Sequence, residues 1–191
     1  MTAASTGSPH GLGPDWVPGP DGLPFRRAAR VILVDASDRV LLMRGHDVDE
    51  PSRTWWFTIG GGIDAGEDAR SAAVRELREE TGLELDAGSL VGPVVTRSAV
   101  FDFFAVTCRQ DEQIFLARLD AHGTHEDSLS RDGWTEVEQR ILDELRWWPL
   151  DALAGVTEEV FPEGLVDLVR DLLAGWDGVT RHLGTQEPTT R

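Results

Sequence analysis

The run Ala69–Thr81 constrains the fold of this chain more than any other stretch. It contains no Pro or Gly, and most of its residues are Ala, Leu, Arg and Glu, which all favour helices. Gly82 follows, and glycine most easily adopts the left-handed conformation at which many helices end. Because Glu76 stands three and four residues before Glu79 and Glu80, a helix places all three carboxylates on one face. The sequence therefore predicts a helix that ends at Gly82 and carries an acidic cluster.

This acidic cluster is unfavourable on its own. Each pair of like charges so placed destabilises an isolated helix by about 0.2–0.5 kcal/mol, and Arg75 and Arg78 offset only part of that cost. A hard divalent cation such as Mg²⁺ would compensate, since it prefers oxygen ligands and commonly links carboxylates to substrate phosphates. The alternative interpretation is a solvated acidic helix face that binds nothing.

A longer pattern surrounds the cluster. Glu67 follows Gly61 by six residues, Arg75 follows Glu67 by eight, and aliphatic residues occupy positions 77 and 83. A chance match to these seven fixed and two aliphatic positions, in a chain of this length, has odds on the order of one in ten million. The segment Gly61–Leu83 resembles the Nudix box of the Nudix hydrolase family and meets it at every specified position, over 23 of 191 residues.

This resemblance implies an α/β fold, an α/β/α sandwich with a mixed central β-sheet. It also implies a divalent-metal cofactor, Mg²⁺ or Mn²⁺. The residues expected to hold the metal are Glu76, Glu79 and Glu80, with Glu67 as an outer member and the backbone carbonyl of Gly60.

The resemblance implies catalytic roles within the box as well. Glu79 is the first choice for the base that activates water, Glu76 shares the catalytic site, and Arg75 is expected to hold a carboxylate in position. Some relatives take the base from a later loop, which makes three further glutamates weaker candidates: Glu126, Glu136 and Glu138.

The implied reaction is metal-dependent hydrolysis of a pyrophosphate bond in a nucleoside diphosphate linked to another moiety. A nucleotide sugar such as ADP-ribose and a nucleoside triphosphate both fit this description. Two other functions stay open: a non-catalytic nucleotide-sensing Nudix domain, and an enzyme that acts on capped or triphosphorylated RNA. The sequence shows no basic stripe with interleaved aromatic residues, which disfavours the RNA substrate.

Substrate contacts are less well defined than the box. Five arginines flank the expected strands and are candidates for binding phosphate, although surface positions also explain them: Arg26, Arg27, Arg44, Arg53 and Arg97. Of these we expect Arg44, Arg53 and Arg97 to contact substrate. Trp55 and Trp56 alternate along one strand, so one is expected to face the core and the other outward, and Trp56 is our candidate for stacking on a base.

The chain is expected to form one domain, residues 25–176, with an irregular Pro- and Gly-rich arm at 1–24 and a loose tail at 177–191. Trp16 is expected to fasten the arm. Runs of β-branched and aromatic residues predict strands at 28–35, 40–43, 54–59, 91–95, 99–108, 113–119 and 144–148. A short helical segment is expected at 136–142, an amphipathic helix at 158–174, and a long loop at 120–135.

The net charge of −16 opposes binding to nucleic acid or to an anionic membrane, but local arginines and metal ions allow a small nucleotide-type substrate. One cysteine excludes an intramolecular disulfide. We expect a cytoplasmic protein, since no secretion signal or membrane-spanning run is found. A homodimer is possible, and nothing in the sequence requires it.

Overall fold

A computed structural model describes residues 12–13, 15–103, 106–120 and 129–187 of the chain. Its strands are β1 (Val17–Pro18), β2 (Pro24–Val34), β3 (Arg39–His46), β4 (Thr54–Gly62), β5 (Val91–Phe103), β6 (Val106–Arg118), β7 (Leu142–Pro149), β8 (Glu159–Phe161) and β9 (Arg181–Gln186). Its helices are α1 (Ala69–Thr81), α2 (Glu138–Ile141), α3 (Leu150–Leu153) and α4 (Leu165–Ala174), with a 3₁₀ turn at Ala87–Ser89.

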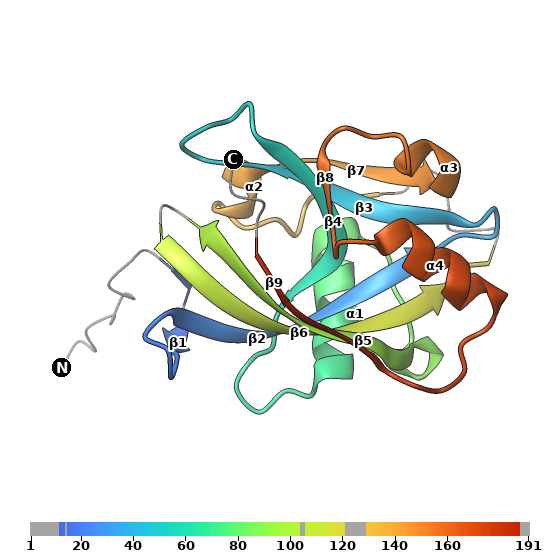
Figure 1. Ribbon diagram of the computed structural model, residues 1–191, viewed down its shortest axis with the longest axis horizontal. Coiled ribbons are helices and arrows are strands. Elements are labelled where there is room, and N and C mark those ends of the chain that lie inside the picture. The colour runs from blue at the N-terminus through green and yellow to red at the C-terminus, as the bar shows by residue number, and fades with distance from the viewer. Residues whose placement is uncertain (1–11, 14, 104–105, 121–128, 188–191) are drawn as a thin grey trace.

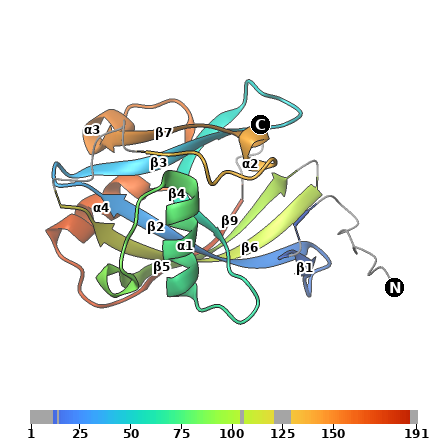
Figure 2. The ribbon, with the colours of Figure 1, turned by 180° about the vertical axis from the view of Figure 1, so that it is seen from behind.

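The strands that the structure describes form one mixed sheet in the order β7-β3-β4-β2-β6-β5-β9, with β1 paired to β2 and β8 paired to β4. The pairs β2–β6, β4–β8 and β5–β9 are parallel, and the others are antiparallel. Helix α1 crosses one face and α4 covers the other, as the front and back views show (Figures 1 and 2). This confirms the predicted α/β/α sandwich.

Two apolar layers hold the helices to the sheet. Ala72, Ala73 and Leu77 of α1 pack with one face of the sheet. On the opposite face, Leu168 and Leu172 of α4 are buried. Successive strand residues point to opposite faces, so the aliphatic run in β2 supplies both layers at once.

Strand β2 changes its antiparallel partner along its length, close to the predicted box. At one end β2 pairs with β3 through Leu33 and Val34, whereas at the other end it pairs with β4 from Ala28 to Val31. Strand β4 pairs with β3 up to Thr58 and with β2 from Ile59 onward. This change of partner brings its last residues, Gly60–Gly62, next to α1, where the Gly60 N–H donates to Glu80.

Three expectations about secondary structure were wrong. The expected strand at 99–108 is instead divided between the end of β5 and the start of β6, which pair antiparallel, and residues 104–105 lie outside the described residues. Residues 159–161 form β8, and the helix starts only after Gly164, whose left-handed φ of 77° interrupts helical geometry. Residues 181–186 are not a loose tail, because backbone pairing with β5 orders them as β9 even though their side chains are largely exposed.

Part of the arm is packed. Trp16 is 7% exposed, clusters with Leu12 and Cys108, and meets Phe101 edge-on. The expectation that Trp16 fastens the arm is therefore confirmed. No helix in the described ranges is long and apolar enough to cross a membrane.

Candidate active site

Helix α1 is delimited at both ends by local chemistry. The Asp68 side chain accepts hydrogen bonds from the backbone N–H groups of Arg70 and Ser71, and Gly82 ends the helix with φ of 74°. The predicted bounds and cap are confirmed. Glu76 and Glu80 lie on the buried side of the helix, 9% and 5% exposed. The helix therefore directs two of its three clustered carboxylates inward.

Arg75 binds three of the box carboxylates. Its Nη2 lies 2.8 Å from Glu67 Oε2, and its Nη1 lies 2.7 Å from Glu76 Oε1 and 3.2 Å from Glu79 Oε2. Its Nη2 also donates to the Gly62 carbonyl at 2.8 Å. The arginine thus joins the start of the box, the acidic helix face and the glycine loop.

The glycine loop packs directly on the acidic helix. The Gly60 N–H donates to Glu80 Oε2 at 2.7 Å. The Gly60 carbonyl accepts from Arg30 Nη1 at 2.9 Å. A side chain on Gly61 would place its Cβ 2.6 Å from Glu76 Oε2. The box glycine is therefore required for the close approach of backbone and carboxylate.

The carboxylates differ in how readily they ionise. Burial, with the neighbouring Glu76 charge adding to it, raises the pKa of Glu80 well above its usual range. Burial also raises the pKa of Glu76, against the opposing effect of Arg75. In contrast, the hydrogen bond from Arg75 lowers the pKa of Glu67. Glu80 has no ion-pair partner among the described residues and is the carboxylate of this helix that most lacks a compensating cation, whereas Glu76 is paired with Arg75.

The donor set fits a hard divalent cation. Within the described ranges, no three Asp, Glu, His or Cys side chains are grouped so as to hold a metal as they stand. Arg75 instead pairs with Glu67, Glu76 and Glu79. The available ligand atoms are nevertheless all oxygens, and the carboxylates outnumber the arginine that neutralises them. Mg²⁺ and Mn²⁺ prefer such a set, and a cation at this place would offset the burial that raises the pKa values of Glu76 and Glu80.

Glu76, Glu79 and Glu80 line a cleft of about 1050 Å³, whereas Glu67, the predicted outer ligand, does not line it. The same cleft is lined by Gly60–Gly62 and by three aromatic residues from two strands, Trp55 and Phe57 of β4 and Phe161 of β8. Arg53 and Arg97, two of the predicted substrate contacts, also line it. The volume is in the range of pockets that bind drug-sized ligands.

Two other predicted substrate contacts do not line this cleft. Trp56 is 2% exposed and packs edge-on against Trp148, at 5.0 Å between ring centroids, in the layer beneath α4. Arg44 pairs with Trp56 across β3 and β4, so it shares that face. The prediction for Trp56 is corrected, because the strand turns Trp55 toward the cleft and Trp56 into the core.

The weaker base candidates are also placed. Glu138 lines the cleft, but its carboxylate accepts from the backbone N–H and the hydroxyl of Thr135. Glu136 is exposed and does not line the cleft. Glu126 lies outside the described residues.

Sequence reasoning missed a buried polar network on the cleft wall formed by β2, β5 and β6. Glu112 accepts from Arg30 Nε at 2.6 Å and from Arg97 Nε at 2.5 Å. Gln110 donates to Glu112 at 2.6 Å and accepts from Arg26 Nε at 2.5 Å. The available signal was the even spacing of Arg26 and Arg30, which places both on one face if the strand begins before position 28, whereas Glu112 lay between two expected strands and gave no signal.

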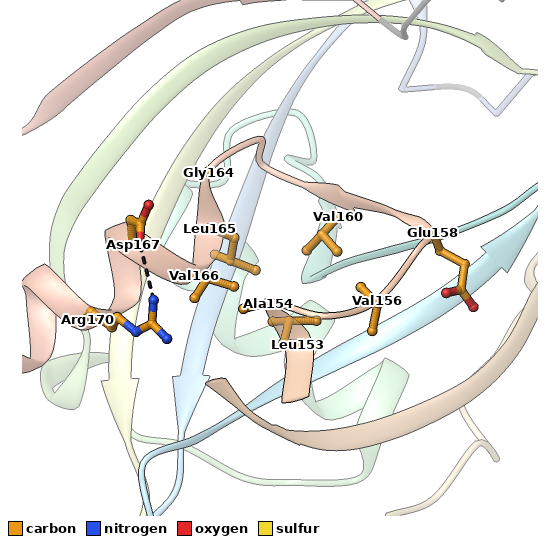
Figure 3. A pocket seen from close by; sticks show the side chains of 10 residues that line it. All are labelled: Leu153, Ala154, Val156, Glu158, Val160, Gly164, Leu165, Val166, Asp167 and Arg170. Atoms are coloured by element: carbon orange, nitrogen blue, oxygen red, sulfur yellow. Dashed lines mark hydrogen bonds and ion pairs between the residues drawn. The ribbon is translucent and has the colours of Figure 1, made fainter. Parts of the chain in front are cut away.

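A second, shallower hollow of about 320 Å³ lies between α3, β8 and α4 (Figure 3). Aliphatic side chains such as Leu153, Val156 and Val160 form most of its lining. Its charged pair, Asp167 and Arg170, is satisfied internally at 3.3 Å. The larger cleft is therefore the candidate active site.

Fold and site together define an α/β/α sandwich whose central helix presents clustered carboxylates to a glycine loop at the floor of a cleft. Comparison with protein families matches residues 24–170 to the family described as NUDIX domain. The match covers well over half the chain, and the protein belongs to the Nudix family.

Curated relatives match over less than half of this chain. The chain is 45% identical over 78 residues to an RNA pyrophosphohydrolase of Sphingopyxis alaskensis, covering 41% of this chain and 45% of the relative. It is 37% identical over 60 residues to an uncharacterized Nudix hydrolase, YvcI, of Bacillus subtilis, covering 31% and 35% of the two chains. The chain thus spans less than half the length of these relatives.

Solved structures share the fold over a larger part of the chain. A MutT protein of Bacillus halodurans has a TM-score of 0.52 at 24% identity, covering 85% of this chain and 89% of that one. An Ap4A hydrolase of C. elegans also has a TM-score of 0.52, at 17% identity, covering 78% and 96%. At these identities the likeness concerns the fold alone.

Proposed function

We propose that this protein hydrolyses a pyrophosphate bond in a nucleotide, with Mg²⁺ or Mn²⁺ as cofactor. One observation carries the proposal: Glu76, Glu79 and Glu80 gather against Gly60–Gly62 in a cleft that also contains exposed arginine and aromatic side chains. A pyrophosphate group needs charge neutralisation and an activated water for hydrolysis. An acidic helix with a purely structural role would not require a cleft of this kind beside its carboxylates.

The residues divide the work according to their burial. Glu76 and Glu80, which are both buried, would hold the metal together with the Gly60 carbonyl. When bound, the metal supplies neutralisation of phosphate charge and a lower pKa for a nearby water. The Glu79 side chain is 43% exposed and is thus the best placed to accept the proton of the attacking water. Arg75 holds the carboxylates of Glu76 and Glu79 in fixed positions, because its Nη1 atom contacts both of them.

The shape of the cleft supports a nucleoside attached to the phosphates. Trp55 lines the cleft and offers a ring face to a base, with Arg53 6.0 Å from the centre of that ring. A nucleotide sugar such as ADP-ribose or a nucleoside triphosphate would suit these residues. Within this proposal the substrate is small, and the protein works without a nucleic-acid or membrane partner.

A second candidate substrate is the triphosphorylated 5′ end of RNA. The names of relatives such as the Sphingopyxis protein favour it, although the matched segment covers only 45% of that relative. The net charge of −16 opposes a long polyanion. Nucleotide sensing without catalysis is the remaining alternative.

Product analysis tests these candidates directly. Wild-type protein with Mg²⁺ or Mn²⁺ would be assayed against ADP-ribose, sugar nucleotides, dinucleoside polyphosphates, nucleoside triphosphates and 5′-triphosphorylated RNA. We expect metal-dependent cleavage that falls about 100-fold or more in Glu79→Gln, because a positioned general base typically contributes that much. Glu136→Gln is the matched control, since this glutamate lies outside the cleft.

The outcomes separate the alternatives. Cleavage of one small nucleotide, lost in Glu79→Gln and retained in Glu136→Gln, supports the proposal. Preferential cleavage of 5′-triphosphorylated RNA would show that RNA, and not a small nucleotide, is the substrate. Tight nucleotide binding without any turnover would establish the sensing function and refute hydrolysis.

A further inference from the structure

Four arginines besides Arg53 line the cleft, and they differ in what they have left to offer a ligand. Arg75 is surrounded by Glu67, Glu76 and Glu79, as described above. Arg30 and Arg97 are each 8% exposed, and both bind Glu112. The side chain of Arg26 is 20% exposed, which is more than the 10% and 6% of the Arg30 and Arg97 side chains. Arg26 is therefore the most accessible arginine of this wall.

The guanidinium of Arg26 is fixed on three sides. Its Nη1 lies 2.9 Å from Asp15 Oδ2, and its Nε donates to Gln110 Oε1. Its plane lies over the Trp16 ring, with Cζ 4.4 Å from the ring centroid. Among the described residues no hydrogen-bond partner is seen for Nη2. One edge of a rigidly held guanidinium thus stays available in the cleft.

Asp15 brings this arginine to the box. The Asp15 Oδ2 atom lies only 2.5 Å from the point where a Cβ on Gly62 would stand. Gly62 is the last residue of β4 and its carbonyl accepts from Arg75. The segment ahead of β1 therefore touches the glycine loop on one side and Arg26 on the other. A rigid fork with a free edge suits a phosphate oxygen, which accepts charge-assisted hydrogen bonds.

The charge of the wall agrees with an anionic ligand. Within the described part of the chain, Arg26, Arg30 and Arg97 form ion pairs with two carboxylates, Asp15 and Glu112, so this ion-paired group carries one net positive charge. The box helix across the cleft is acidic. A pyrophosphate held at the box would thus find its compensating protein charge on the Arg26 side.

We propose that Arg26 is a substrate-binding residue for the phosphates, and that Asp15 of the N-terminal segment is the residue that positions it. The inference rests on the proposed function, because it assigns a further contact for the same substrate. It makes the segment around Asp15 part of the active site, in addition to its packing through Trp16.

Binding of methylenediphosphonate in the presence of Mg²⁺ tests the assignment without turnover. This pyrophosphate analogue has a bridging carbon that cannot be hydrolysed. We expect Arg26→Ala to weaken its affinity about 10- to 100-fold, which is the loss of one charge-assisted hydrogen bond or more. Arg26→Lys, which keeps the charge but loses the fork, should fall between Arg26→Ala and the wild type.

Arg109 provides a matched control. It also lies over an aromatic ring, Phe25, and pairs with an aspartate of the N-terminal region, Asp21, but it does not line the cleft. Arg109→Ala should leave the affinity within about twofold of the wild type, since the change touches no ligand. Thermal unfolding of each variant shows whether the fold is kept, and Arg26→Lys carries the test if Arg26→Ala does not fold.

Asp15→Asn tests positioning through a double-mutant cycle. If Asp15 acts through Arg26, Asp15→Asn lowers the affinity of the wild-type protein for the analogue. The same change should have no further effect on the affinity of the Arg26→Ala variant. Turnover assays should show the corresponding rise in KM with kcat little changed.

Equal effects of Arg26→Ala and Arg109→Ala, an unchanged affinity in Arg26→Ala, or no binding of the analogue by the wild type would each overturn the assignment. Additive effects of Asp15→Asn and Arg26→Ala would overturn the positioning role. A protein that binds the analogue through Arg26 but hydrolyses nothing would refute the proposed function and leave this inference standing.

Discussion

Glu112→Gln is expected to destabilise the protein in a pH-dependent way. The carboxylate is 3% exposed and lies between Arg30 and Arg97. Burial opposes its ionisation, but the two arginines outweigh burial and lower the pKa of Glu112 from 4.5 to about 2. A carboxylate whose pKa is lower in the folded state stabilises the fold above its unfolded pKa. That contribution is lost as the pH falls toward the folded pKa.

The magnitude follows from this pKa difference of about 2.5. At about 1.4 kcal/mol for each pKa unit, ionised Glu112 contributes about 3 kcal/mol at pH 7. At pH 3.5 the same linkage leaves about 2 kcal/mol, because the unfolded chain is then largely protonated. Gln has the same shape and no charge, so the stability lost in Glu112→Gln should shrink between these two pH values.

Urea denaturation followed by tryptophan fluorescence measures both values. Asp38→Asn is the control, since Asp38 and Arg118 form an exposed pair with side chains 58% and 52% exposed. We expect the control to change the free energy of unfolding by less than about 1 kcal/mol at either pH. A loss below about 1 kcal/mol for Glu112→Gln at pH 7, or an equal loss at both pH values, would refute this reasoning.

Three further predictions concern the box helix and the neighbouring strand. Glu80→Gln should raise the unfolding free energy of the metal-free protein. The gain should grow as the pH rises above 4.5, because burial raises the pKa of Glu80 and makes its charged form costly; denaturation in EDTA at pH 5 and pH 8 measures it, and a less stable variant at pH 8 would contradict it. Gly82→Ala should cost about 1 kcal/mol or more in denaturation experiments, because φ is 74° and the new Cβ would stand 2.9 Å from Ser130 Cβ; an unchanged midpoint would count against the cap. Trp56→Ala should cost about 3–5 kcal/mol of stability, whereas Trp55→Ala should mainly raise KM. A large loss of stability in Trp55→Ala together with a raised KM and normal stability in Trp56→Ala would contradict this prediction.

Local sequence was sufficient for the box helix and for most strands. The bounds of α1 follow from helix propensity, the Asp68 cap and Gly82, all of which act over a few residues. The hairpin of β2 and β3 follows from β-branched runs around a turn. In the turn, the buried Asp35 side chain accepts from the backbone N–H groups of Ser37 and Arg39. Interactions between residues only a few positions apart can be predicted from the local sequence.

Strand β9 shows where local reasoning fails. Its residues have little apolar character, and their order comes from backbone hydrogen bonds to β5 together with contacts such as Gln186 to Arg97 at 2.6 Å. These two residues lie 89 positions apart in the chain. A segment stabilised mainly by an existing sheet edge carries no pattern of its own.

The sequence by itself determined the acidic helix, because helix propensity and the cap act over a few residues, and the resemblance of Gly61–Leu83 to the Nudix box supplied the family and the candidate metal ligands. It also determined that Trp55 and Trp56 point to opposite faces of β4. Only the tertiary structure decided which of them lines the cleft. It also joined Arg30 to Glu112, 82 residues later in the chain. Such pairings depend on which strands meet across the sheet, and strand order is a property of the whole packed chain.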